Sequence, residues 1–137
     1  MHNNKSNLYS LRVFYEDTDA GGIVYYANYL KFLERARTEW LRALGITQSN
    51  FLEQNFAFVV RHVEIDYLIS AKLDDLLTIN SEIILLKRAS LIFKQQILNQ
   101  NNQLIVSAFI TVAAVNFKQG KPCAIPKTIL GALKRVS

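Results

Sequence analysis

The chain has 137 residues, the length of one ordinary domain, and 50% of them are hydrophobic, which is enough for a proper core. Sixteen Lys and Arg against eleven Asp and Glu leave a net charge of +5, which favours anionic partners. The basic residues are spread in ones and twos, and no nucleic-acid-binding motif is present, so we expect no nucleic-acid partner. We predict one folded domain over residues 1–137.

The first ten residues contain no apolar run and therefore no secretory signal, and we expect 1–8 to be a flexible lead-in. The longest mostly apolar run, 104–117, is shorter than the roughly 18 residues of a membrane helix. The one cysteine, Cys123, cannot form an internal disulfide, and the two histidines lie far apart in the sequence. We therefore expect a reducing, cytoplasmic location and no metal.

Residues 11–16 alternate in the manner of a β-strand, and the paired glycines 21–22 then predict a turn. After this turn the apolar spacing changes from two to about 3.6 residues, which predicts one long helix from Tyr29 to Leu44. Gly45 is the usual residue for a left-handed helix end, and a second short helix is expected over 49–53. The apolar stripe of the long helix comprises Tyr29, Phe32, Leu33, Ala36, Trp40, Ala43 and Leu44.

Residues 57–68 alternate in the manner of a strand with one solvent-exposed face, with Val59 and Val63 on one side and Val60 and His62 on the other. Three more strands are predicted, and their short connections indicate antiparallel pairing. Their ranges are 76–86, 91–98 and 104–117, and a short helix or tail follows over 128–136.

One early strand, one long helix and four further strands form an α+β pattern in which the sheet must cover the helix. A single curved sheet wrapped around the helix does so. Its edge strands would stay unpaired, which favours pairing between the sheets of two copies.

The segment from Tyr15 to Tyr29 joins acidic, glycine and aromatic residues at the start of the long helix, and we interpret it as a reaction site. Asp19 is expected at the turn, close to the free N–H groups of the helix. The alternative for Asp19 is a capping role at the turn or helix. Asp17, two residues earlier, is interpreted as mainly structural.

These residues resemble the hotdog-fold acyl-CoA thioesterases of the 4-hydroxybenzoyl-CoA thioesterase type, and most of all the YbgC subgroup, which is encoded beside the Tol-Pal envelope system. The resemblance implies a hotdog fold, with a curved five-stranded antiparallel sheet around one long central helix. It also implies hydrolysis of acyl-CoA thioesters without a cofactor, since CoA is part of the substrate. The motifs that carry it are Asp17-Thr18-Asp19, Gly22-Ile23-Val24-Tyr25, Asn28-Tyr29 and 32–37, followed by 58–61, 71–75, 90–93 and 126–127.

By this resemblance Asp19 is the catalytic carboxylate, acting as nucleophile or as general base. Tyr26 stands where the subgroup usually has His, and we hypothesise that it contacts the substrate or Asp19; the alternative is a wall of the acyl pocket. The thioester oxygen would bind to backbone amides near Gly22 and near Phe58 of a facing subunit. Asn28 belongs to the same predicted substrate-binding set.

Coenzyme A phosphates require exposed cations, and the resemblance points to Lys87, Arg88 and Lys127. For each of them, a merely solubilising role is the alternative. Ser90 matches a strand-start serine that would contact pantetheine, or it is a turn residue.

The expected partner is a thioester of CoA or of an acyl carrier protein, and the expected assembly is a homodimer or homotetramer. A peripheral association with the inner membrane is left open. The competing function is an acyl-carrier or envelope-associated binding protein that has the fold and pocket but little hydrolytic activity.

Overall fold

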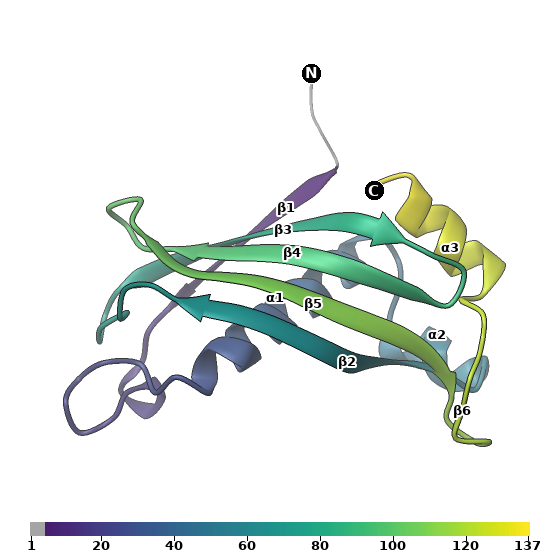
Figure 1. The fold of residues 1–137 in the computed structure, drawn as a ribbon, viewed down its shortest axis with the longest axis horizontal. Helices are drawn as coiled ribbons and strands as arrows, with labels where there is room; N and C mark the ends of the chain where they lie inside the picture. The colour runs from purple at the N-terminus through teal and green to yellow at the C-terminus, as the bar shows by residue number, and fades with distance from the viewer. Residues whose placement is uncertain (1–4) are drawn as a thin grey trace.

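The computed structural model describes residues 5–137, except for the side chains of residues 48, 50 and 52. The long strands form one antiparallel sheet in the order β1-β3-β4-β5-β2, and α1 lies against one face of it (Figure 1). The elements are β1 (Ser6–Arg12), the 3-10 turn η1 (Tyr15–Asp17), α1 (Asn28–Ala43), α2 (Gln48–Glu53), β2 (Phe56–Tyr67), β3 (Leu76–Leu86), β4 (Ser90–Leu98), β5 (Leu104–Asn116), β6 (Lys121–Pro122) and α3 (Lys127–Lys134).

This architecture confirms the predicted α+β hotdog fold, with five long strands around a central helix and a two-residue β6 added beside β5. Within residues 5–137, no helix combines the length and the apolar character needed to cross a membrane.

The beginning of the chain differs from the prediction in two ways. β1 begins at Ser6 and pairs with β3, so the expected lead-in of 1–8 is wrong for residues 6–8, while residues 1–4 lie outside the described part. The strand also ends at Arg12 instead of continuing to residue 16. The reason is local: the Asp17 carboxylate accepts a hydrogen bond from the Phe14 amide at 2.8 Å, and this turn replaces strand pairing.

The two faces of β2 also differ from the prediction. The pairing of β2 with β5 shifts at Arg61, which forms a β-bulge. Because of this extra residue, Val60 and Val63 lie on the same side of the sheet, opposite buried residues of β5, while Val59 and His62 lie on the other side. A one-residue shift exchanges the faces of a strand, so the strict alternation predicted across 57–68 was wrong beyond the bulge.

The predicted long helix is confirmed, and Gly45 adopts the left-handed conformation expected at its end, with φ of 83°. Ala43 is exposed, although we expected it in the apolar stripe. Arg37, a charged residue that the stripe did not include, is buried instead. The buried residues of α1 are Tyr29, Phe32, Leu33, Ala36, Arg37 and Trp40.

Arg37 is buried within a polar network between α1 and the sheet. Its Nη1 donates to Oε1 of Gln95 at 2.9 Å, and Nε2 of Gln95 donates to the carbonyl of Leu33 at 3.0 Å and to Oγ of Ser81 at 2.9 Å. Burial lowers the pKa of Arg37 to about 10, so the guanidinium is still charged at neutral pH. The fully buried Gln95 therefore provides the hydrogen-bond acceptor that this buried guanidinium requires.

Replacement of Gln95 by Leu should lower the free energy of unfolding by about 3 kcal/mol, because it leaves a buried guanidinium without its acceptor. Urea unfolding followed by circular dichroism measures this change. The double variant Arg37→Met/Gln95→Leu should recover part of the loss, since no buried charge remains. A double variant less stable than Gln95→Leu would contradict this interpretation.

Candidate active site

The loop between β1 and α1 is fixed by hydrogen bonds to the segment that follows β2. The amide of Val24 donates to the carbonyl of Ala71 at 2.9 Å, and the amide of Leu73 donates to the carbonyl of Gly22 at 3.1 Å. The Tyr29 hydroxyl accepts a hydrogen bond from the Ala71 amide at 3.0 Å. The end of the loop and the start of α1 are thus held against the same segment.

Asp19 begins a tight turn within this loop. The Gly22 amide donates to the Asp19 carbonyl at 3.0 Å, and Gly22 has φ of 79°, a conformation that residues with a Cβ rarely adopt. The Gly21 amide donates to Oδ1 of Asp19 at 2.8 Å. The main chain therefore orients a carboxylate that is exposed in the single chain.

Asp17 has a different role from Asp19. Its carboxylate closes the 3-10 turn through the bond to the Phe14 amide, and its carbonyl accepts from Nδ2 of Asn28 at 2.9 Å. The structural interpretation of Asp17 is confirmed. Asn28, which we predicted as a substrate-binding residue, uses its side-chain amide to connect the first residue of α1 to this turn.

A cavity of about 330 Å³ lies beside Asp19. Its walls come from the loop and from the end of β2, and several of its residues are tyrosines. The rings of Tyr26 and Tyr67 meet edge to face with centroids 6.1 Å apart, and those of Tyr29 and Tyr67 lie 5.7 Å apart. Tyr26 is 60% exposed, so its phenol is accessible at the mouth of the cavity.

The phenols of Tyr29 and Tyr67 stay protonated at neutral pH. Burial raises the pKa of Tyr29, and burial together with the nearby Tyr26 raises the pKa of Tyr67. A neutral phenol can donate a hydrogen bond but cannot act as a base. Among the residues that line this cavity, Asp19 is the one carboxylate available for base or nucleophile chemistry.

The structure brings Asp19, Gly22 and Tyr26 together in the loop before α1, with Asn28 at the first residue of that helix, but it leaves the other predicted residues elsewhere. Phe58 lies near the start of β2, whereas the cavity lies at the end of that strand. In Figure 1 the loop before α1 and the turn between β3 and β4 lie at opposite ends of the sheet.

The predicted cations do gather at that far end. The carbonyl of Arg88 accepts a hydrogen bond from the Ile125 amide at 2.8 Å, which joins the β3–β4 turn to the segment before α3. Lys87 and Arg88 on this turn, and Lys127 at the start of α3, are all exposed. They form one basic region in the tertiary structure.

Lys87 also lines a hollow of about 380 Å³ together with Ser90, Arg61 and His62. The bulge of β2 at Arg61 and a second bulge of β3 at Ile84 lie on either side of one residue pair, Ile92 of β4 and Thr111 of β5. Bulges bend and twist strands, and these two account for the hollow in the face of the sheet. Ser90 thus lies beside the basic region and not beside Asp19 of its own chain.

The sequence interpretation missed Tyr29 and Tyr67 as residues of the cavity. Tyr29 was assigned to the core stripe, and its ring does contact Phe32, but it also borders the cavity. No local signal marks Tyr67, because its position depends on the bulge in β2 and on the bonds that fix the loop.

A family model described as the thioesterase-like superfamily matches residues 13–133. The chain belongs to the thioesterase-like superfamily. It is 48% identical over 125 residues to the acyl-CoA thioesterase YbgC of Haemophilus influenzae, covering 90% of this chain and 91% of the relative. It is 45% identical over 125 residues to the acyl-CoA thioester hydrolase YbgC of Escherichia coli O6:H1, covering 91% and 93%.

A solved structure supports the same assignment. The probable thioesterase from Bartonella henselae is 38% identical and superposes with a TM-score of 0.78, covering 89% of this chain and 99% of that one. The predicted resemblance to the hotdog thioesterases, and to the YbgC subgroup within them, is confirmed.

The two carboxylates of this thioesterase loop should differ in their effect on stability. Asp17→Ala should lower the free energy of unfolding by about 1 kcal/mol, because it removes a capping acceptor. Asp19→Ala should change it by less than about 0.5 kcal/mol, since its bond to Gly21 lies in an exposed turn. Urea titrations of both variants measure the difference, and equal losses would contradict the separation of roles.

Proposed function

We propose that this chain is a cytoplasmic acyl-CoA thioesterase that hydrolyses its substrate to the free acid and CoA through Asp19. The observation that carries the proposal is the Asp19 turn. There an exposed carboxylate, oriented by the Gly21 amide, lies at the edge of a cavity beside the start of α1. The names of the YbgC relatives describe the same reaction class.

A thioester carbonyl is activated enough for one positioned carboxylate to start its hydrolysis. As a nucleophile, Asp19 would attack the carbonyl carbon and expel the CoA thiolate, and water would then hydrolyse the mixed anhydride. As a general base, it would take a proton from the water that attacks the same carbon. Both routes give one carboxylic acid and one CoA thiol for each water consumed.

The developing oxyanion needs N–H donors that are not already used. The Gly22 amide, near which we expected them, donates to the Asp19 carbonyl and so closes the turn. The amides of Ile23 and Tyr26 have no acceptor within residues 5–137. Tyr26 lies two residues before α1, where the helix dipole favours negative charge, and we assign the oxyanion to its amide.

We further propose that the active unit is a homodimer formed along β2. This strand is an edge of the sheet, is 12 residues long, and exposes Val59 and Val60 by 42% and 51%. A long apolar edge strand is a template for pairing with a second copy. A two-fold axis across β2 would bring the beginning of one β2 to the end of the other, and so Phe58 of one protomer toward Asp19 of its partner.

The same two-fold axis supports the assignment of Lys87, Arg88 and Lys127 to the CoA phosphates. In one chain these exposed cations lie on the β3–β4 turn and at the start of α3, at the end of the sheet opposite the loop before α1 that carries Asp19. In the dimer they would lie at the end occupied by the partner's Asp19. Ser90, beside Lys87 in the hollow of the outer face, would then contact the pantetheine arm.

Asp19→Asn should lower the rate of thiol release from acyl-CoA by roughly 100-fold or more, because the amide can act neither as base nor as nucleophile. Free thiol is measured with a chromogenic disulfide over acetyl-, butyryl-, decanoyl- and benzoyl-CoA. Asp17→Asn is the matched control and should retain most of the activity. Equal rates for wild type and Asp19→Asn, or binding of acyl-CoA without turnover, would instead favour the acyl-binding alternative.

Arg88→Ala should raise the KM for acyl-CoA roughly tenfold, as expected for one lost charge-assisted contact to phosphate. It should leave unchanged the KM for the matching N-acetylcysteamine thioester, which has no phosphates. Lys134→Ala removes the same charge from the exposed end of α3 and is the control. An unchanged KM for acyl-CoA would contradict the assignment of Arg88 to the CoA phosphates.

A further inference from the structure

The segment between β2 and β3 holds the loop of Asp19 at two points. Just after the end of β1, the Val13 amide donates to the carbonyl of Asp75 at 2.9 Å. Beyond the Asp19 turn, Ile23 forms an antiparallel bridge with Lys72. The Asp19 amide itself donates to the Ile23 carbonyl at 2.9 Å. The position of the Asp19 turn therefore depends on the conformation of the segment from Lys72 to Asp75.

This segment is a tight turn with an unfavourable backbone conformation. The Asp75 amide donates to the Lys72 carbonyl at 3.1 Å, and Asp74 has φ of 71°, in the left-handed region that residues with a Cβ seldom adopt. The Asp75 carboxylate stabilises the turn, since its Oδ2 accepts from the Lys72 amide at 2.9 Å. A residue in such a conformation keeps it only while the surrounding contacts hold it there.

Gln100, on the turn between β4 and β5, supplies two of these contacts. Its Nε2 donates to Oδ1 of Asp75 at 2.9 Å, and its Oε1 accepts from the Leu76 amide at 3.1 Å. Figure 1 shows the β4–β5 turn and the β2–β3 connection at the same end of the sheet as the loop before α1. One side chain thus joins the end of the strained turn to a neighbouring hairpin.

A side-chain amide satisfies both partners of Gln100 at once. The Asp75 carboxylate requires a donor, and the Leu76 amide requires an acceptor. A Glu in this place could only accept from these partners at neutral pH, and a Lys could only donate. The residue type therefore matches this bridging role.

The β4–β5 turn does not use the Gln100 side chain for its own closure. The side chain of Asn99 closes it instead, because its Oδ1 accepts from the amides of Asn101 and Gln103 at 2.9 and 3.0 Å. Nδ2 of Asn99 also donates to Oε1 of Gln103 at 2.8 Å. The bonds of Gln100 thus serve the segment after β2.

We propose that Gln100 is a positioning residue for the reaction at Asp19. It acts through Asp75, whose turn fixes the Asp19 loop on both sides and so fixes the direction of the Asp19 carboxylate. This inference rests on the proposed thioesterase function. A displacement of about 1 Å between reacting groups can cost about 100-fold in rate, so a contact this far from the reaction affects its speed.

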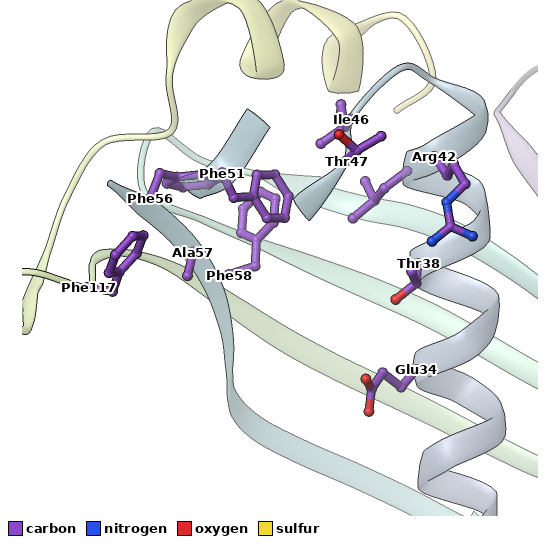
Figure 2. A pocket seen from close by; sticks show the side chains of 11 residues that line it. Glu34, Thr38, Arg42, Ile46, Thr47, Phe51, Phe56, Ala57, Phe58 and Phe117 are labelled. Carbon is purple, nitrogen blue, oxygen red and sulfur yellow. The ribbon is translucent and has the colours of Figure 1, made fainter. Parts of the chain in front are cut away.

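The contacts of Gln100 are separate from the opposite end of the molecule. A cavity of about 290 Å³ between α1, α2 and the start of β2 lies there, with Phe51, Phe56 and Phe58 in its wall (Figure 2). None of the residues that line it in the described part of the chain belongs to 71–76 or 99–103. The basic region assigned to the CoA phosphates lies at that opposite end as well. A change at Gln100 should therefore alter kcat and not KM.

Gln100→Ala should lower kcat for thiol release from butyryl-CoA roughly tenfold and leave KM unchanged, because the turn that holds the Asp19 loop relaxes. Gln103→Ala is the matched control. It truncates a second exposed amide side chain of the same turn, one that bonds to Asn99 and not to Asp75, and it should keep the wild-type kcat. Rates are compared at a temperature at which circular dichroism shows every variant folded. An unchanged kcat in Gln100→Ala would overturn the inference.

An exchange of chemical roles separates positioning from a general loss of stability. Asp75→Asn places two donors against each other, and Gln100→Glu places two carboxylates against each other, so each single variant should lower kcat. In the double variant Gln100→Glu/Asp75→Asn, the new amide donates to the new carboxylate, and the bonds to the Lys72 and Leu76 amides remain. The double variant should recover most of the wild-type kcat. Losses that simply multiply would contradict the proposed coupling.

Hydrogen exchange at the Leu73 amide reports on the loop without any measurement of activity. This amide donates to the Gly22 carbonyl at 3.1 Å, and its exchange should be roughly tenfold faster in Gln100→Ala but not in Gln103→Ala. Equal exchange rates in the two variants would overturn the inference. Thiol release that depends on Asp19 but not on Gln100 would overturn it and leave the proposed function standing. The absence of thiol release by the wild-type protein from every acyl-CoA would overturn both.

Discussion

The hydrogen bonds between the loop before α1 and the segment after β2 are the constraint on which the site depends. Ala71 accepts from the amide of Val24 and donates to the hydroxyl of Tyr29, and Leu73 binds the carbonyl of Gly22. These contacts fix the end of the loop, which carries the Asp19 turn, against that segment. They also connect that turn to β2, the strand whose free edge we assign to the dimer interface.

A turn fixed in this way can present a carboxylate without burying it. Asp19 is oriented by one main-chain amide in an exposed turn, while the neighbouring Asp17 is engaged in the framework. The sequence places both acids within three residues, but their chemistry differs because one carboxylate caps a turn and the other faces a cavity. In our proposal, the preorganisation of Asp19 therefore comes from backbone geometry and not from a network of charged side chains.

The position of the acids, cations and aromatic residues explains why one copy is an incomplete enzyme in our proposal. The loop before α1, which carries Asp19, lies at the opposite end of the sheet from the start of β2, which carries Phe58, and from the β3–β4 turn of the basic region (Figure 1). Its free edge provides the symmetric contact that would unite them. The strand that would join two copies would then also align the Asp19 carboxylate of one with the substrate contacts of the other.

The sequence by itself determined the fold class, the long helix with its glycine end, and the loop that carries Asp19, because these follow from local periodicity and from the needs of a turn. Only the tertiary structure decided the faces of β2, since the bulge at Arg61 arises from pairing with β5. It also decided the burial of Arg37, because a guanidinium can be buried in a core only where a hydrogen-bond acceptor such as Gln95 lies across the helix–sheet interface. The cavities have the same origin: their walls come from segments far apart in the chain, whose distances no local pattern encodes.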